Sequence, residues 1–168
     1  DEVIVPSPYF PEYEHYIKNH GGKMRIVPTK DDFSLDIDVI KNALSFSTAA
    51  VLINSPNNPT GKIYTEEEIS FLSDALNEFG KKSGRFPLLI CDEPYRAITY
   101  GKAKVSSVFK RYENSAVVTS FAKNFSVPGE RIGYIAVNPS CLEGESLVSA
   151  LNLATRILGF VNAPAFFQ

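Results

Sequence analysis

The feature that most constrains this chain is a repeated pattern, in which an apolar β-type run is followed closely by a polar cluster. The runs are Ala49–Ile53, Pro87–Cys91 and Ala116–Thr119, and the clusters after them are Asn54–Gly61, Asp92–Arg96 and Ser120–Arg131. Helical or helix-length segments separate the runs, and strands that alternate with helices form a parallel sheet. Ligands of such sheets bind outside the carboxyl ends of the strands. We therefore predict an α/β fold that brings the three polar clusters to one crevice.

Local signals predict the remaining elements. Asp36 is placed as the N-cap of one helix, and Thr65 and Glu68 have the spacing of a capping box at the start of a long amphipathic helix. Gly21 and Gly22 match a glycine helix stop. Further strands are predicted at Val3–Val5, Met24–Val27 and Ile132–Val137, and helices at Glu12–Asn19, Asp36–Leu44, Thr65–Lys82 and Glu145–Leu158.

Composition and charge argue against several classes of function. The 168 residues include 17 Lys and Arg against 19 Asp and Glu, which gives a net charge of -2 without a basic block. Binding of nucleic acid or of an anionic membrane as a main role therefore has no support. Since no apolar run approaches the roughly 20 residues that span a bilayer, no membrane-spanning helix is predicted.

The cysteines and histidines do not suggest a disulfide framework or a metal site. Cys91 and Cys141 are too few for a framework, and Cys91 lies in an apolar run, where a reduced thiol packs well. This use of cysteine predicts a cytoplasmic protein. His15 and His20 do not share a helical face, and no cysteine or carboxylate cluster lies near them, so no metal is predicted.

Two charged groups stand out by their positions. Asp92 follows a continuous apolar run, the pattern of a strand buried on both faces, and a carboxylate there is costly unless it meets a cation or a donor. The alternative is a helix N-cap or a structural ion pair, and nearby Tyr95 could be a surface aromatic. Lys123 lies beyond a strand end, where desolvation can lower the pKa of an amine, so it is a candidate nucleophile. An ordinary solvated charge is its alternative.

The other candidates have simple structural alternatives as well. Arg131 could form a salt bridge with Glu130, or it could lie beside Ser120 and bind a phosphate dianion by paired hydrogen bonds. Asn58 belongs to an Asn-Asn-Pro-Thr-Gly sequence, which favours a plain turn. The functional interpretation needs the Asn58 amide held rigidly and turned into the crevice. The joint occurrence of all these groups at strand ends favours the functional interpretation.

These motifs resemble those of the class I/II pyridoxal-phosphate (PLP)-dependent aminotransferases of fold type I, which include the aspartate aminotransferase-like enzymes. The matching motifs are NNPTG, DEPY and the SxxK…PGxRxG signature, here Ser120–Lys123 with Pro128–Gly133. Their order, spacing and flanking strands agree over essentially the whole chain. The resemblance implies a three-layer αβα domain with a mostly parallel sheet, in which Ile132–Val137 is antiparallel.

The resemblance also implies a role for each candidate. Lys123 would form the Schiff base with the cofactor aldehyde and later move the substrate proton. Asp92 would pair with the pyridine nitrogen, and Tyr95 and Asn58 would donate to the 3′-oxygen of the ring. The remaining implied contacts are the phosphate ligands Ser120 and Arg131 and the stacking ring of Phe10, with the adjacent Tyr9 as the alternative for stacking.

The resemblance further implies that residues 1–168 are the central part of a PLP-binding large domain. The N-terminal arm, the first strand and the C-terminal small domain would be absent from this sequence, which neither starts with Met nor ends in polar, flexible sequence. The full-length protein is expected to be a homodimer. Arg156 and the segment 160–163 resemble the region that contacts the neighbouring active site.

The implied activity is transfer of an amino group from an L-amino acid to a 2-oxo acid. Two alternatives stay open at this point. The first is a PLP-dependent lyase, such as a carbon–sulfur β-lyase or an enzyme like aminocyclopropane-carboxylate synthase, because these chemistries share the same cofactor contacts. The second is a catalytically incompetent fragment or scaffold of this fold, since a fold does not decide a function.

Overall fold

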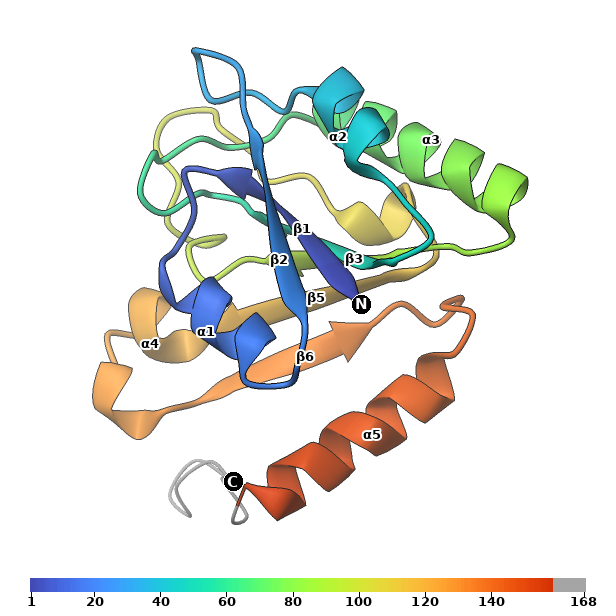
Figure 1. Ribbon diagram of the computed structural model, residues 1–168. Coiled ribbons are helices and arrows are strands. Elements are labelled where there is room, and N and C mark those ends of the chain that lie inside the picture. Colours follow the sequence, from blue (N-terminus) through green and yellow to red (C-terminus); the bar gives the residue numbers. More distant parts are fainter. Residues whose placement is uncertain (159–168) are drawn as a thin grey trace.

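A six-stranded sheet forms the middle of the molecule (Figure 1). The computed structural model describes residues 1–158. The strands lie in the order β2-β1-β3-β4-β5-β6 and all neighbours are parallel except β5 and β6, which confirms the predicted antiparallel strand. The strands are β1 (Glu2–Ser7), β2 (Lys23–Pro28), β3 (Thr48–Asn54), β4 (Leu88–Asp92), β5 (Ser115–Ser120) and β6 (Gly133–Val137).

The four predicted helices are present with slightly different bounds, and the structure adds one short helix, α4, that was not predicted. The helix-length connection from β4 to β5 contains a short 3-10 turn, η1, and is otherwise irregular. The helices are α1 (Glu12–Lys18), α2 (Ile37–Ala43), α3 (Glu66–Ser83), α4 (Phe121–Asn124) and α5 (Gly144–Ile157), with 3-10 turns at η1 (Val108–Lys110) and η2 (Pro128–Glu130).

Side-chain caps fix the ends of α2 and α3 as predicted. The Asp36 carboxylate accepts a hydrogen bond from the Val39 amide at 3.2 Å. Thr65 and Glu68 form the reciprocal capping box, with each side chain accepting from the other residue's backbone amide. Gly84 ends α3 in the left-handed conformation that glycine adopts without strain.

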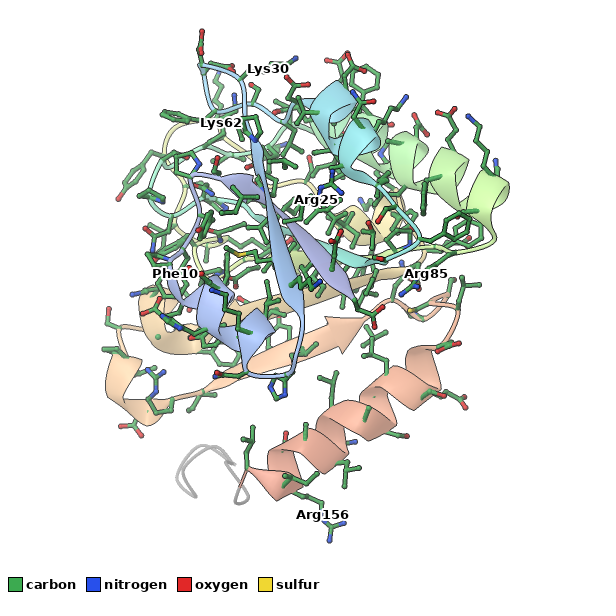
Figure 2. The ribbon with its side chains drawn as sticks, viewed as in Figure 1. Phe10, Arg25, Lys30, Lys62, Arg85 and Arg156 are labelled. Atoms are coloured by element: carbon green, nitrogen blue, oxygen red, sulfur yellow. The ribbon has the colours of Figure 1, made fainter. Side chains whose placement is uncertain are left out.

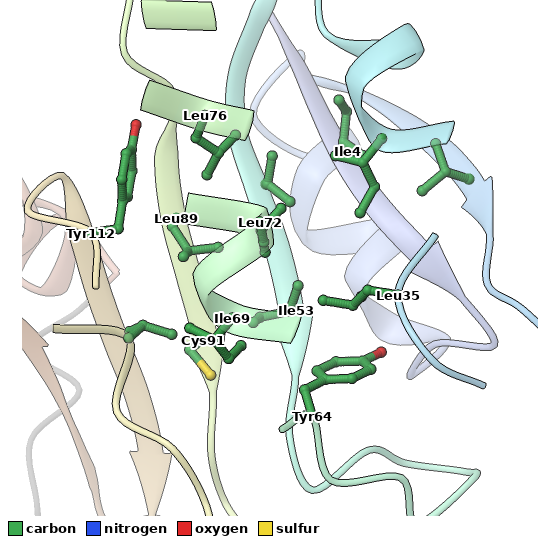
Figure 3. Packing of buried hydrophobic residues seen from close by; sticks show 14 of the residues in the cluster. Ile4, Leu35, Ile53, Tyr64, Ile69, Leu72, Leu76, Leu89, Cys91 and Tyr112 are labelled. Carbon is green, nitrogen blue, oxygen red and sulfur yellow. The ribbon is translucent and has the colours of Figure 1, made fainter. Parts of the chain in front are cut away.

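One face of the sheet carries the hydrophobic core (Figure 3). The apolar stripe of α3, including Leu72 and Leu76, packs on strand residues such as Val51 and Leu89, and all four are fully buried. Cys91 also belongs to this core, which confirms the predicted buried thiol. Helices α2 and α3 form the outer layer on this side of the sheet (Figure 1).

The opposite face is covered by α1 and α5 and is more open. Val118 and Ile135 are paired across β5 and β6 and point away from the core, and they line a pocket together with Val148 and Leu151 of α5. The continuous apolar run of β4 predicted a strand buried on both faces. The structure differs, because β4 is buried more deeply on one face than on the other. Its alternate residues are fully buried toward α3 and half-buried toward the second face. The three layers are αβα.

Among residues 1–158, no helix combines the length and the apolar character that crossing a membrane requires.

Candidate active site

The three polar clusters begin at one edge of the sheet. Asn54 lies opposite Asp92 in the ladder between β3 and β4, and Asp92 lies opposite Val118 in the ladder between β4 and β5. Ser120, two residues after Val118, pairs with Gly133 at the start of β6. The prediction that these clusters meet at the carboxyl ends of adjacent strands is therefore confirmed.

The Asn54 side chain ties the first two clusters together. Its amide nitrogen donates to the Asp92 carbonyl at 2.9 Å, and its oxygen accepts from the Asn58 amide at 2.6 Å. The buried Asn57 closes the following turn, because its side-chain oxygen accepts from both the backbone and the hydroxyl of Thr60. Asn58 is half-buried, and its side-chain amide makes no hydrogen bond within residues 1–158. A rigid turn thus leaves the side-chain amide of Asn58 open to a ligand.

Asp92 is a half-buried carboxylate that accepts a hydrogen bond from one group among residues 1–158. The Tyr13 hydroxyl donates to Oδ2 of Asp92 at 2.5 Å. Burial raises the pKa of Asp92 above its usual value, and the hydrogen bond from Tyr13 opposes that rise. Within residues 1–158, Asp92 caps no helix and pairs with no cation, so neither structural alternative applies to it.

Lys123 on α4, just after β5, lies close to Tyr95 in the loop that follows β4. The Lys123 Nζ atom lies 5.8 Å from the centroid of the Tyr95 ring. Lys123 is exposed and forms no salt bridge with any described residue, and the Tyr95 hydroxyl has no hydrogen-bond partner among them. Among the described residues, the structure therefore places a lysine side chain without a salt bridge near the ring of a tyrosine whose hydroxyl has no hydrogen bond.

The short helix α4 holds Lys123 in place. Ser120 is its N-cap and accepts a hydrogen bond from the Ala122 amide at 3.1 Å. The Phe121 ring contacts the rings of Phe125 and Tyr134, with centroids 5.4 and 5.7 Å away. Since α4 has a cap at its start and an aromatic anchor on β6, the backbone under Lys123 is fixed from two sides.

Arg131 lies close to Ser120 because β6 starts beside the end of β5. Its backbone adopts the left-handed conformation, with φ 53° and ψ 41°, which is uncommon for a residue other than glycine. The guanidinium donates to the Pro128 carbonyl at 3.0 Å and forms no salt bridge with Glu130. Ser120 Oγ lies 3.3 Å from the Ile132 carbonyl, so its own proton has a backbone partner here.

Gly133 permits this close approach of β5 and β6. A Cβ atom at this position would lie 2.4 Å from the Thr119 carbonyl oxygen, closer than van der Waals contact allows. The last glycine of the PGxRxG signature therefore has a steric reason. It lets Arg131 reach the end of the strand that carries Ser120.

Phe10 lies just before α1 (Figure 2). Its ring packs on that of Tyr13. The two rings meet edge to face, with centroids 5.6 Å apart and planes at 76°. Because Tyr13 binds Asp92, this contact brings Phe10 to the same side of the crevice. Tyr9 makes no aromatic ring contact within residues 1–158.

Two residues of this site were not identified from the sequence. Tyr13 lies in the first turn of α1, three residues after Phe10, and an aromatic residue so close to the predicted stacking ring is the signal that could have found it. Asn54 is the first residue of its polar cluster, and its role as a tie between β3 and β4 depends on strand pairing that only the fold shows. The predicted segment 160–163 lies outside the described residues.

The open groups suit the chemistry of PLP. A carboxylate with a free oxygen can accept from a pyridinium, an amine can add to an aldehyde, an amide and a phenol can donate to a ring oxygen, and a guanidinium can bind a phosphate. The order of the sheet and its αβα layers define the class of protein, the α/β architecture of fold type I.

The comparison with known families gives the particular family. The family model described as aminotransferase class I and II matches residues 1–166, and the chain belongs to that family. The aspartate aminotransferase of Bacillus subtilis is 37% identical over 142 residues, which cover 81% of this chain. A probable aspartate/prephenate aminotransferase of Aquifex aeolicus is 39% identical over 142 residues, again 81% of this chain.

A solved amino transferase from Eubacterium rectale has a TM-score of 0.95 and 43% identity, covering 99% of this chain and 42% of that one. The chain spans 35% and 34% of the lengths of the two curated relatives, so only about a third of each is represented.

Proposed function

We propose that the whole protein is a PLP-dependent aminotransferase that moves an amino group from an L-amino acid to a 2-oxo acid. Membership of the family and relatives described as aspartate aminotransferases support this activity. The observation that carries it is a set of polar groups at the ends of β3, β4 and β5 that have no hydrogen-bond or salt-bridge partner within residues 1–158: the Asn58 side-chain amide, one Asp92 oxygen, the Tyr95 hydroxyl and the Lys123 ammonium.

The catalytic residues of this proposal are Lys123, Asp92 and Tyr95. When bound, PLP supplies an electron sink for the bond broken at the substrate Cα. Lys123 would hold the cofactor through its aldehyde, and the same amine would be placed to move the proton at the substrate Cα by general acid–base catalysis. Asp92 would accept a hydrogen bond from the protonated ring nitrogen, and Tyr95 and the Asn58 side-chain amide would donate to the ring oxygen.

The phosphate and the ring face involve the other predicted residues. Arg131 would bind the phosphate through its remaining guanidinium nitrogens, and Ser120 would contribute its hydroxyl once that group turns away from the Ile132 carbonyl. Phe10 would stack on the ring. An edge-to-face contact with Tyr13 leaves at least one face of Phe10 uncovered by the Tyr13 ring.

We also infer that this chain is the central part of a PLP-binding large domain, in a cytoplasmic homodimer. The share of the relatives that it spans supports the first inference. The two free cysteines, one of them buried in β4, fit a reducing compartment. Exposed apolar side chains on α5, among them Leu153 and Ile157, favour a protein partner on that surface.

Reductive labelling tests the proposed activity. The whole protein is loaded with PLP, reduced with borohydride and mapped by mass spectrometry. We expect the label on Lys123, with no label at that position in Lys123→Ala and full labelling in Lys110→Ala, which removes another exposed lysine. Transaminase activity should fall at least about 100-fold in Lys123→Ala. A label elsewhere would contradict the proposal.

A spectroscopic experiment separates transfer from elimination. Addition of an amino acid should convert the bound cofactor to its pyridoxamine form. Release of pyruvate and ammonia without that conversion would instead identify a lyase.

A further inference from the structure

The Tyr13 hydroxyl is the only group among residues 1–158 that donates a hydrogen bond to the Asp92 carboxylate. Tyr13 lies on α1, and Asp92 is 79 residues later at the end of β4. Tyr13 is 5% exposed, and Asp92 is the only partner of its hydroxyl in this part of the chain. Such a contact fixes the rotamer of the carboxylate as well as satisfying a buried phenol.

The electrostatics of Tyr13 and Asp92 keep the shared proton on the Tyr13 hydroxyl. Burial, followed by the charge of Asp92, raises the pKa of Tyr13 far above its usual value, so the phenol stays protonated and acts as a donor. Burial also raises the pKa of Asp92, and the hydrogen bond from Tyr13 is what lowers it again. The phenol therefore favours the ionised carboxylate in a place where burial favours the neutral acid.

The geometry leaves half of the carboxylate available. Tyr13 occupies Oδ2, whereas Oδ1 receives no hydrogen bond from any described residue. The rings of Phe10 and Tyr13 meet edge to face. Tyr13 thus contacts two of the residues assigned to the cofactor.

We propose that Tyr13 is a positioning residue, which holds Asp92 through Oδ2 so that an ionised Oδ1 faces the ring nitrogen of PLP. This role rests on the proposed function, because it concerns the same cofactor. It differs from a purely structural role in its consequences. If the Tyr13 phenol only packed in the core, its removal would change the stability of the fold alone. A positioning phenol also sets the pKa of Asp92 and the affinity for the cofactor.

The test compares Tyr13→Phe with Tyr16→Phe in the whole protein. Both variants remove one hydroxyl from the same helix, but Tyr16 is 59% exposed and has no contact with Asp92. The pKa of Asp92 is measured in the ligand-free protein by carbon-13 NMR of labelled aspartate, with Asp92→Asn used to assign the signal. We expect Tyr13→Phe to raise this pKa by about 1 to 2 units, and Tyr16→Phe to leave it unchanged.

Cofactor affinity gives a second readout. At neutral pH we expect PLP to dissociate about tenfold more readily from Tyr13→Phe than from the wild-type protein. The ratio should grow as the pH falls, because the variant protonates Asp92 at a higher pH. In the Asp92→Asn background the Tyr13→Phe change should lose most of its effect, since coupled residues are not additive.

The outcomes separate this inference from the proposed function. Equal Asp92 pKa values in Tyr13→Phe and Tyr16→Phe would overturn the positioning role even if PLP binds normally. A wild-type protein that binds no PLP would overturn the proposed function and with it the part of Tyr13 in cofactor binding. A raised Asp92 pKa together with weaker PLP binding in Tyr13→Phe alone supports both.

Discussion

The two halves of the sheet differ in how well they are covered. Strands β1, β3 and β4 lie under α2 and α3, where Leu72 and Leu89 are completely buried. At the other end of the sheet, no residue of α5 is fully buried, and Leu153 is 59% exposed. The candidate site crosses this boundary. Asn58 and Asp92 come from the covered half, and Lys123 and Arg131 come from the open half.

The helix ends show the same contrast. Helix α3 has a reciprocal capping box at its start and a left-handed glycine at its end. Helix α5 has Glu143 as its N-cap, and the Glu143 side chain forms no capping hydrogen bond. Local sequence thus stabilises α3 independently of its packing, and α5 depends on contacts with other surfaces. The helix with local caps, α3, thus belongs to the covered half of the sheet, and the helix without a side-chain cap, α5, belongs to the open half.

The largest effect is expected from truncating the core. Leu72→Ala should lower the free energy of unfolding by about 2 to 5 kcal/mol, because it removes a fully buried side chain and leaves a cavity. Leu153→Ala on α5 should change it by less than about 0.5 kcal/mol. Urea denaturation followed by circular dichroism measures both. Equal costs would break the contrast between the two halves.

The next effect concerns the junction of β5 and β6. Gly133→Ala should lower the free energy of unfolding by about 1 to 3 kcal/mol, since the new Cβ collides with the Thr119 carbonyl. Gly129→Ala is the matched control, because a Cβ there meets nothing within 4 Å. Thermal unfolding compares the two. A Gly133→Ala protein as stable as the control would show that β6 can move away from β5 at little cost.

Removing the cap of α3 should have a smaller effect. Thr65→Ala should lower the free energy of unfolding by about 1 kcal/mol, because the Glu68 amide loses its partner. Thr155→Ala, inside α5, removes a hydroxyl that bonds only to the preceding turn and should change stability by less than about 0.5 kcal/mol. Chemical denaturation of both variants sharpens the comparison of the two helices.

The smallest effect depends on pH. The folded-state pKa of Asp92 is raised, so its protonated form favours the folded protein and stability falls as the pH rises through that pKa. Asp92→Asn should therefore stabilise the ligand-free protein slightly at pH 7, by less than the cap effect. The gain should vanish below the ordinary aspartate pKa of about 3.9.

Denaturation curves across pH check this prediction, with Asp74→Asn on the exposed face of α3 as the control. A loss of stability at pH 7 in Asp92→Asn would indicate that the carboxylate is stabilising in the folded protein. That result would contradict the dominance of burial in the environment of Asp92.

The sequence predicted the features that are encoded locally. The cap at Asp36, the capping box at Thr65 and the strand positions follow from spacing and periodicity within a few residues. The antiparallel β6 came from the family resemblance and was confirmed. The connection from β4 to β5 was predicted only to be of helix length, because length alone does not distinguish a helix from irregular chain.

The site could be predicted in part. The meeting of the three clusters follows from the rule for parallel sheets, and the structure confirms it. The individual cofactor roles of Lys123 and Asp92 stay predictions. The contact between Tyr13 and Asp92 could not be foreseen, because it joins elements that only the order of the strands brings together.

That contact has a consequence for the assembly of the protein during synthesis. When α1 has left the ribosome, the strand that carries Asp92 has not yet been synthesised. The Tyr13 hydroxyl can therefore form its hydrogen bond to Asp92 only later in synthesis. Contacts over long stretches of chain form slowly, since the intervening segment has to be ordered first. The contact between α1 and the end of β4 therefore forms late, after β3 and α3 have been synthesised between the two partners.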